Sequence, residues 1–187
     1  MGGISCREGK LSDAWAIGRL HVDSWRETYA GLLPDELLDS LSVEARSAMW
    51  SSVLGEPDGS RQTAVFVAES GGEIVGFGAC GGQRDEGLRN RGFIAEIGAL
   101  YVRKSNQGAG IGRCLMGHLA RKLLEQGRAA ASLWVLRENI SARRFYERMG
   151  GTRVGERVGE QGGATLYEVA YGWSDLAIVP GITLENG

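Results

Sequence analysis

Residues 108–112 contain three glycines, and they lie between a strand-like apolar run and a helical pattern. The apolar run covers residues 94–102, and the helical pattern repeats an apolar residue every four positions from Ile111 to Leu123. Glycine at a helix start lets an anion approach the backbone N–H groups closely, and the helix dipole favours negative charge there. The sequence therefore predicts a strand, a diphosphate-binding turn and a helix in succession.

Two familiar phosphate-binding motifs do not fit these glycines. A Walker loop needs Lys-Ser or Lys-Thr directly after its second glycine, and no glycine of this stretch is followed by such a pair. A dinucleotide fingerprint needs glycine or alanine where the chain has Arg113 or Leu115, depending on which glycine it starts from. Such a fingerprint would also follow the first strand of its unit rather than a hairpin. ATPase and dehydrogenase functions therefore lose their main support.

The composition limits the protein class and its partners. The 187-residue chain is 43% apolar and 24% charged, which fits one globular domain with a sizeable core. A formal net charge of −2 provides no basic surface for nucleic acid. No run approaches the roughly 18 apolar residues of a membrane span, and the N-terminal residues lack the apolar segment of a signal peptide. We therefore expect a cytoplasmic protein with neither nucleic-acid nor membrane partners.

The cysteines and histidines are few and scattered. The odd number and wide spacing of Cys6, Cys80 and Cys114 predict free thiols in a reducing compartment. His21 and His118 lie far apart, and neither belongs to an evident cluster of metal ligands. The sequence therefore predicts no metal site.

Periodicity and turn residues predict a mixed α/β sheet in the order strand, two or three helices, three strands, helix, strand, helix, two strands. The predicted strands cover residues 4–7, 64–70, 74–82, 93–102, 130–136, 152–158 and 164–171. The predicted helices cover residues 12–29, 34–41, 42–54, 110–126 and 140–149. Residues 55–60 and 83–91 read as polar loops, and residues 173–187 as a tail after one domain of residues 1–172.

Two finer expectations concern packing. Gly98 lies inside a predicted strand, where glycine indicates a bulge or a close backbone approach. Met49, Trp50 and Val53 are expected to pack inward from the third helix.

Two separated motifs resemble those of one enzyme superfamily. Gln107-x-x-Gly110-x-Gly112 resembles the first signature of the GCN5-related N-acetyltransferase (GNAT) superfamily, and residues 139–151 resemble its second. The preceding strand and the element order over residues 4–172 are similar to the family as well. The resemblance implies the GNAT fold, in which the fourth and fifth strands splay apart.

The resemblance also implies a donor, an acceptor and a binding site. The donor would be acetyl-CoA, with no metal, and the acceptor a primary amine of a small molecule or peptide. A homodimer is left open as a further partner. The residues that would bind acetyl-CoA through the splayed strand, the glycine turn and the second signature are Leu100, Tyr101, Val102, Gln107, Gly108, Ala109, Gly110, Ile111, Gly112, Arg113 and Asn139.

Two residues match the family's positions for acid–base chemistry. Glu96 would act as the base that deprotonates the amine, directly or through water, and Tyr146 as the acid that protonates the leaving thiolate. The alternatives are a solvated glutamate at a strand start and a tyrosine used for packing. Asn139 fits a helix N-cap as well as a CoA contact. We favour direct transfer in a ternary complex over an acetylated Cys114.

The acceptor side is less defined. His21, Trp25 and Tyr29 share one helix face and could line an amine pocket, or they could pack on the sheet. The arginines of residues 83–91 could meet an acidic substrate or lie in a solvated loop. A non-catalytic acyl-CoA-binding or regulatory module, and an enzyme that uses a longer acyl chain, remain alternatives.

Overall fold

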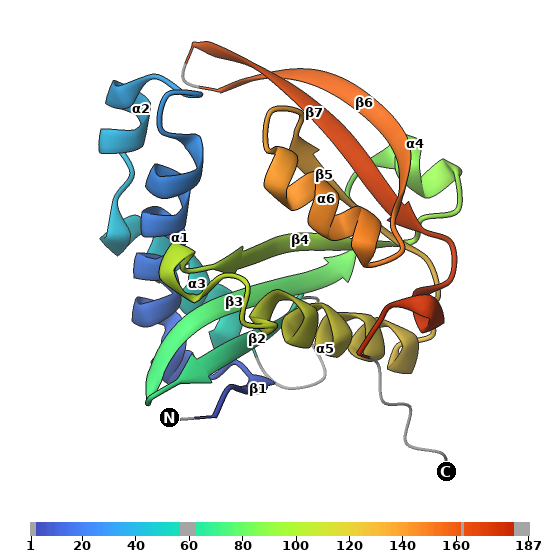
Figure 1. The fold of residues 1–187 in the computed structure, drawn as a ribbon, viewed down its shortest axis with the longest axis horizontal. Helices are drawn as coiled ribbons and strands as arrows, with labels where there is room; N and C mark the ends of the chain where they lie inside the picture. The colour runs from blue at the N-terminus through green and yellow to red at the C-terminus, as the bar shows by residue number, and fades with distance from the viewer. Residues whose placement is uncertain (1–2, 57–62, 162, 182–187) are drawn as a thin grey trace.

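A computed structural model describes residues 3–56, 63–161 and 163–181 of the chain. It contains a seven-stranded sheet with the strand order β1-β2-β3-β4-β5-β7-β6 (Figure 1). The strands are β1 (Ser5–Glu8), β2 (Thr63–Ser70), β3 (Glu73–Gly82), β4 (Ala95–Val102), β5 (Ala131–Leu136), β6 (Thr152–Gln161) and β7 (Ala164–Trp173). The helices are α1 (Ala14–Tyr29), α2 (Asp35–Asp39), α3 (Val43–Gly55), α4 (Glu86–Asn90), α5 (Ile111–Glu125) and α6 (Ile140–Arg148), with short 3-10 turns η1 (Leu11–Asp13), η2 (Lys104–Asn106) and η3 (Leu176–Ile178).

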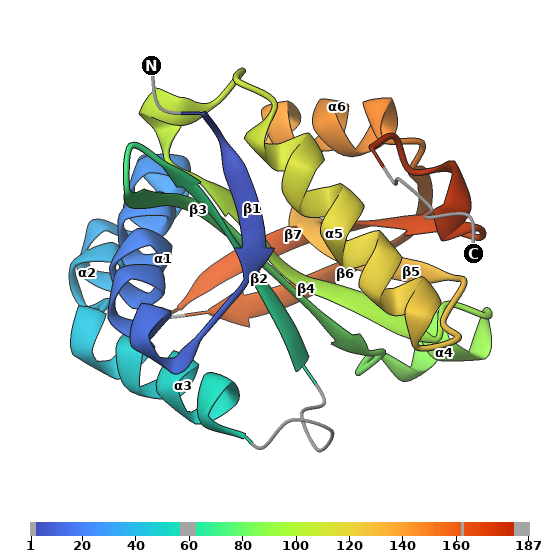
Figure 2. The same cartoon turned by 90° about the horizontal axis from the view of Figure 1, so that it is seen from below.

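The sheet is covered on both faces, as Figures 1 and 2 show. The buried residues of α1 and α3 pack with alternate residues of β2 and β3, such as Val65 and Phe77. The buried face of α5 and residues of α6 pack with the intervening positions, such as Phe66. Successive strand side chains point to opposite faces, so one apolar strand serves both layers.

The predicted order of elements is confirmed, with one helix added and one packing expectation reversed. Residues 86–90 form helix α4 inside the expected polar loop, because the Asp85 side chain accepts a hydrogen bond from the Leu88 N–H (3.0 Å) and Leu88 is buried. Met49 was expected to pack inward but is 38% exposed, whereas Trp50 is buried. Residues 57–60 of the other expected loop lie outside the described residues.

The strands β4 and β5 separate soon after they meet. Their parallel pairing is confined to Ala95 with Ala131 and Glu96 with Ser132, although β4 continues to Val102. The prediction of splayed strands is therefore confirmed. On the other side of β4, the register with β3 shifts between Ala79 and Cys80 so that Gly98 has no partner, which confirms the bulge.

Residues 173–179 continue into the core. Trp173, Leu176 and Val179 are all buried, and the Leu176 N–H donates a hydrogen bond to the Ala129 carbonyl (2.8 Å). A Cβ added at Gly151 would lie 2.7 Å from the Trp173 ring, so this ring occupies the space that a side chain at position 151 would need. Among the described residues, no helix combines the length and apolar character needed to cross a membrane.

The prediction of three free thiols is wrong for two of them. Cys6 on β1 and Cys114 on α5 form a disulfide across 108 residues of sequence, while Cys80 is free and buried. The cause is tertiary, because β1 pairs with β2 at the sheet edge and α5 crosses the same face, so that β1 and α5 lie in contact (Figure 2). Cys114 is therefore not the free buried thiol that the sequence suggested.

Candidate functional site

The glycine turn exposes the start of helix α5. Gly108 and Gly110 have positive φ values of 80° and 84°, a backbone conformation that side-chain-bearing residues rarely adopt. Gly110 is the N-cap of α5, and no side chain caps the helix. The N–H groups of the first turn therefore lack capping partners and can bind an anion.

Gly112 is required for a different reason. Its backbone is helical, and a Cβ added there would lie 3.2 Å from two atoms of the Phe145 ring. This close approach sets α6 against the first turn of α5. The first signature thus contains two glycines for backbone conformation and one for packing.

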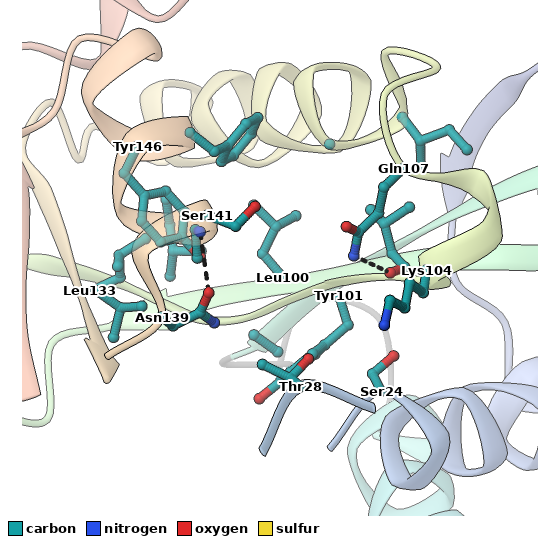
Figure 3. Close-up of a pocket in the computed structure, with 18 of the residues that line it drawn as sticks. Ser24, Thr28, Leu100, Tyr101, Lys104, Gln107, Leu133, Asn139, Ser141 and Tyr146 are labelled. Carbon is teal, nitrogen blue, oxygen red and sulfur yellow. Dashed lines mark hydrogen bonds between the residues drawn. The ribbon is translucent and has the colours of Figure 1, made fainter. Parts of the chain in front are cut away.

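The separation of β4 from β5 leaves one edge of β4 open. The Arg103 N–H donates to the Val75 carbonyl on β3 (2.9 Å), and the direction of backbone groups alternates along a strand. The N–H and C=O groups of Leu100 and Val102 therefore point toward the opening. The Gln107 side chain already uses this edge, since its Nε2 donates to the Val102 carbonyl (3.1 Å; Figure 3).

A cavity of about 510 Å³ runs along this open edge and past the glycine turn. Gln107 and Lys104 lie at one end of the view in Figure 3, and Asn139 and Tyr146 at the other. Of the residues expected to bind acetyl-CoA, all except Ala109 line this cavity. Sequence reasoning did not single out Ser24 or Thr28, which α1 contributes to the same wall.

Tyr146 and Asn139 come from α6 and its start. Tyr146 is buried against Phe145, Tyr171 and Trp173, and burial raises the pKa of its hydroxyl, which stays protonated at neutral pH. The Asn139 Oδ1 accepts a hydrogen bond from the Ala142 N–H (3.1 Å), so Asn139 is the N-cap of α6. Its amide NH₂ group remains as a donor at the cavity wall.

Glu96 lines a second cavity, of about 610 Å³. The Arg84 guanidinium donates to both carboxylate oxygens, with Nε 2.9 Å from Oε2 and Nη2 2.7 Å from Oε1. These hydrogen bonds raise the pKa of Arg84. Only 13% of the Glu96 side chain is exposed, against 78% of Arg84, so the carboxylate belongs to the wall and the guanidinium lies at the surface.

The three aromatic residues of α1 have different positions. Trp25 and Tyr29 line the second cavity, and the Trp25 Nε1 donates to the Tyr101 hydroxyl (3.0 Å). His21 lines neither cavity. Its Nδ1 accepts a hydrogen bond from the Trp50 Nε1 (3.2 Å), and burial lowers its pKa to about 4, so the ring is a neutral part of the core.

The remaining wall of the second cavity was not anticipated from the sequence. Arg157 lies over the Trp134 ring (4.3 Å to its centroid), and its Nε donates to Glu168 (2.6 Å). A tryptophan inside an apolar strand and charged residues on a hairpin carry no local signal of a site. The cavities meet where β4 and β5 separate, since both are lined by Tyr29, Ile97, Gly98, Tyr101, Trp134 and Val135.

The sequence of this chain is similar to that of known acetyltransferases. The sequence model of the acetyltransferase (GNAT) family matches residues 16–151. An uncharacterized N-acetyltransferase of Bacillus subtilis, YuaI, is 35% identical over 175 residues, which cover 93% of this chain and 95% of YuaI.

Solved structures share the fold. The PaiA N-acetyltransferase of Thermoplasma acidophilum in complex with coenzyme A has a TM-score of 0.69 at 19% identity and covers 90% of this chain and 98% of its own. YncA of Salmonella typhimurium, with its cofactor acetyl-CoA, has a TM-score of 0.66 at 21% identity. The match covers 92% of this chain and 94% of YncA. At these identities the likeness concerns the fold alone.

Proposed function

The chain belongs to the acetyltransferase (GNAT) family and is an acetyl-CoA-dependent acetyltransferase, and we propose that it transfers the acetyl group directly to a primary amine of a small molecule or peptide. The observation that carries the proposal is the meeting of two cavities at the split between β4 and β5. A donor in one cavity and an amine in the other would meet beside Gly98, so no acetylated enzyme is needed.

The first cavity suits the diphosphate and the pantetheine arm of acetyl-CoA. Uncapped N–H groups after Gly110 would bind the diphosphate, and the exposed Arg113 adds positive charge at the same wall. The open edge of β4 and the Asn139 amide offer hydrogen bonds to the amide groups of the arm. Acetyl-CoA supplies the activated acetyl thioester.

The same edge of β4 would polarise the thioester. Negative charge develops on the carbonyl oxygen as the amine attacks, and a preorganised backbone N–H stabilises this charge without rearrangement. The N–H groups of Leu100 and Val102 are the candidates, because the backbone alternation that sends the Arg103 N–H to β3 directs theirs to the opening. The Tyr101 N–H points to β3 and is not available to the thioester, so Tyr101 contributes only its side chain to the cavity walls.

An amine with a pKa near 10.4 is protonated at neutral pH, so it needs a base. Glu96 lines the second cavity and would accept the proton. The Arg84 side chain donates to both of its oxygens, and the Arg84 backbone N–H also donates to Oε2 (3.3 Å). Oε1 keeps a lone pair, through which a bridging water would link this base to the amine.

Tyr146 would protonate the leaving thiolate of CoA. Tyr146 lines the first cavity, and the raised pKa of its hydroxyl keeps the proton in place throughout the neutral range. Burial also makes the Tyr146 phenolate unfavourable. After donating its proton to the thiolate, Tyr146 would therefore be reprotonated by solvent or by the proton that the amine releases.

The test combines binding and turnover. Calorimetry with acetyl-CoA measures the donor half, and release of free CoA thiol over a panel of amines and peptides measures transfer. Each peptide is paired with its N-acetylated form as a matched control. Thiol release with free amines and none with their acetylated forms supports the proposal. Failure to bind acetyl-CoA refutes it, and binding without release by any amine favours the non-catalytic module.

A further inference from the structure

Three possible metal ligands meet behind the first turn of α5, outside both cavities. They are Cys6 on β1 with Cys114 and His118 on α5, and their ligand atoms lie within 4.8 Å of one another. None of the three lines the first or the second cavity. In the structure the two sulfur atoms are joined as a disulfide.

The arrangement is fixed by the fold. Cys114 and His118 are four residues apart on a helix, which places both on one face, the spacing with which helices often present two metal ligands. Cys6 faces them from the edge strand, paired through Ala68 of β2. The ring of Phe66 packs on the His118 ring, with centroids 5.3 Å apart. All three ligand residues are half-buried, so an ion could reach them from solvent.

We propose that Cys6, Cys114 and His118 bind a thiophilic divalent cation such as Zn²⁺ when the disulfide is reduced. Two thiolates and one imidazole are ligands that Zn²⁺ prefers, and a water molecule would complete a tetrahedral site. A dithiol reductant supplies two electrons and two protons, converts the disulfide into two thiols and is itself oxidised to a disulfide. Metal binding then releases the two thiol protons, so the disulfide and the metal site exclude each other.

One neighbouring cation affects the site. The Arg121 Nη2 lies 3.2 Å from the His118 Nδ1, and the Arg121 Nε lies 3.7 Å from a carboxylate oxygen of Glu125. A metal bound at Nδ1 would use the lone pair that now faces Arg121. A metal bound at Nε2 would move the ring proton to Nδ1. In both cases the contact with Arg121 is lost or weakened. Arg121 can turn fully to Glu125, and two thiolates balance the charge of the metal. Replacing Arg121 with Ala should therefore leave metal binding intact or tighten it.

The experiment uses the full chain, reduced with a non-thiol phosphine and kept free of oxygen. Co²⁺ is the spectroscopic probe, because thiolate ligands give it a charge-transfer band in the near ultraviolet, and Zn²⁺ is then used to displace it. We expect one ion per reduced chain and no band in the oxidised chain. Cys6→Ser, Cys114→Ser and His118→Gln should each abolish stoichiometric binding, while acetyl-CoA binding reports that each variant is folded.

Cys80→Ala is the matched control, since Cys80 is the remaining cysteine and lies outside the cluster. It should bind the metal like the reduced wild-type chain. Should this variant fail to fold, alkylation of the wild-type chain replaces it: Zn²⁺ should protect Cys6 and Cys114 and leave the modification of Cys80 unchanged. No binding by the reduced wild type, or binding retained by the Cys6→Ser, Cys114→Ser double variant, overturns the proposal.

Discussion

The two cavities that meet at β4 have walls of different kinds. The first cavity, proposed for the donor, is lined by β4 and the glycine turn, whose backbone groups are available there, together with residues of α1, β5 and α6. The second cavity, proposed for the acceptor, is lined by residues of α1, the β3–β4 loop, β4, β5 and the β6–β7 hairpin, and it contains several charged side chains. Its charges are already paired, Arg84 with Glu96 and Arg157 with Glu168.

This difference bears on which part of such a site can be read from a sequence motif. Backbone groups can be aimed only by fixing the backbone, so a donor site of this kind leaves glycines at fixed spacing in the sequence. Side chains can be exchanged without changing the fold, so the acceptor wall is free to differ between members of one family. If the second cavity holds the acceptor, as proposed, the acceptor has to be identified from the side chains of that cavity.

The largest expected effect is at the donor wall. Tyr146→Phe should lower kcat by roughly 10²- to 10³-fold, because the proposed acid is removed from an otherwise unchanged wall. The affinity for acetyl-CoA, measured by calorimetry, should change little. Tyr171→Phe is the matched control, since Tyr171 is buried against Tyr146, donates its own hydroxyl to Glu147 (2.6 Å) and lines neither cavity. Equal losses in the two variants would remove Tyr146 from the chemistry.

Glu96→Gln tests the acceptor wall. It should lower kcat/KM for the amine by roughly 100-fold at neutral pH, since the amide cannot accept the proton. The deficit should shrink as pH rises toward 10, where the amine loses its proton unaided. Steady-state rates across this pH range measure the effect.

Glu73→Gln is the control for Glu96. Glu73 also pairs with an arginine, Arg103 (3.0 Å), and lies outside both cavities. It should keep wild-type rates at every pH. A deficit in Glu96→Gln that does not change with pH would mean that Glu96 holds Arg84 in place and does not move a proton.

The fold was largely predictable, because its elements carry local signals. Apolar residues at helical spacing predicted α5, and two apolar runs separated by Gly71 and Gly72 predicted the hairpin of β2 and β3. Helix α4 was missed because only five residues form it and its signals are one Asp85 cap and one buried leucine. The link between Cys6 and Cys114 was missed because 108 residues separate them. Only the packing of α5 across the sheet edge brings them together.

The candidate site divides in the same way. Gly108 and Gly110 were recognisable because their positive φ values demand glycine. Trp134 and Glu168 were missed because their types also suit an ordinary strand. His21 shares a helix face with Trp25 but lies deeper, where it accepts a hydrogen bond from Trp50 on α3. Helical spacing predicts which residues share a face of the helix. It does not predict which of them lie in the core and which line a cavity.

A smaller effect is expected from the conformation of the glycine turn. Gly110→Val places a branched side chain at a φ of 84°, which costs about 1–2 kcal/mol and shifts the first turn of α5. The Kd for acetyl-CoA should rise roughly 10-fold, with the amine KM unchanged. Gly127→Val is the matched control, because Gly127 follows the other end of α5 with a φ of 73° and, like Gly110, has open space around it. A similar rise in Kd for both variants would show a general loss of stability and no local role.

The smallest effect on catalysis is expected at His21. His21→Asn keeps an acceptor for the Trp50 N–H and should leave kcat/KM unchanged, since His21 lines neither cavity. Its effect is on stability: the folded pKa of about 4 lies below the unfolded value of 6.5, so the unfolded chain binds more protons between these values. The wild type therefore loses stability as pH falls from 6.5 to 4, by about 1–2 kcal/mol at pH 5 from this group. Urea unfolding should show that the free energy of unfolding falls less between pH 7 and pH 5 in His21→Asn than in the wild type. An equal fall in both chains, together with a raised KM for the amine, would mean that His21 belongs to the acceptor site and not to the core.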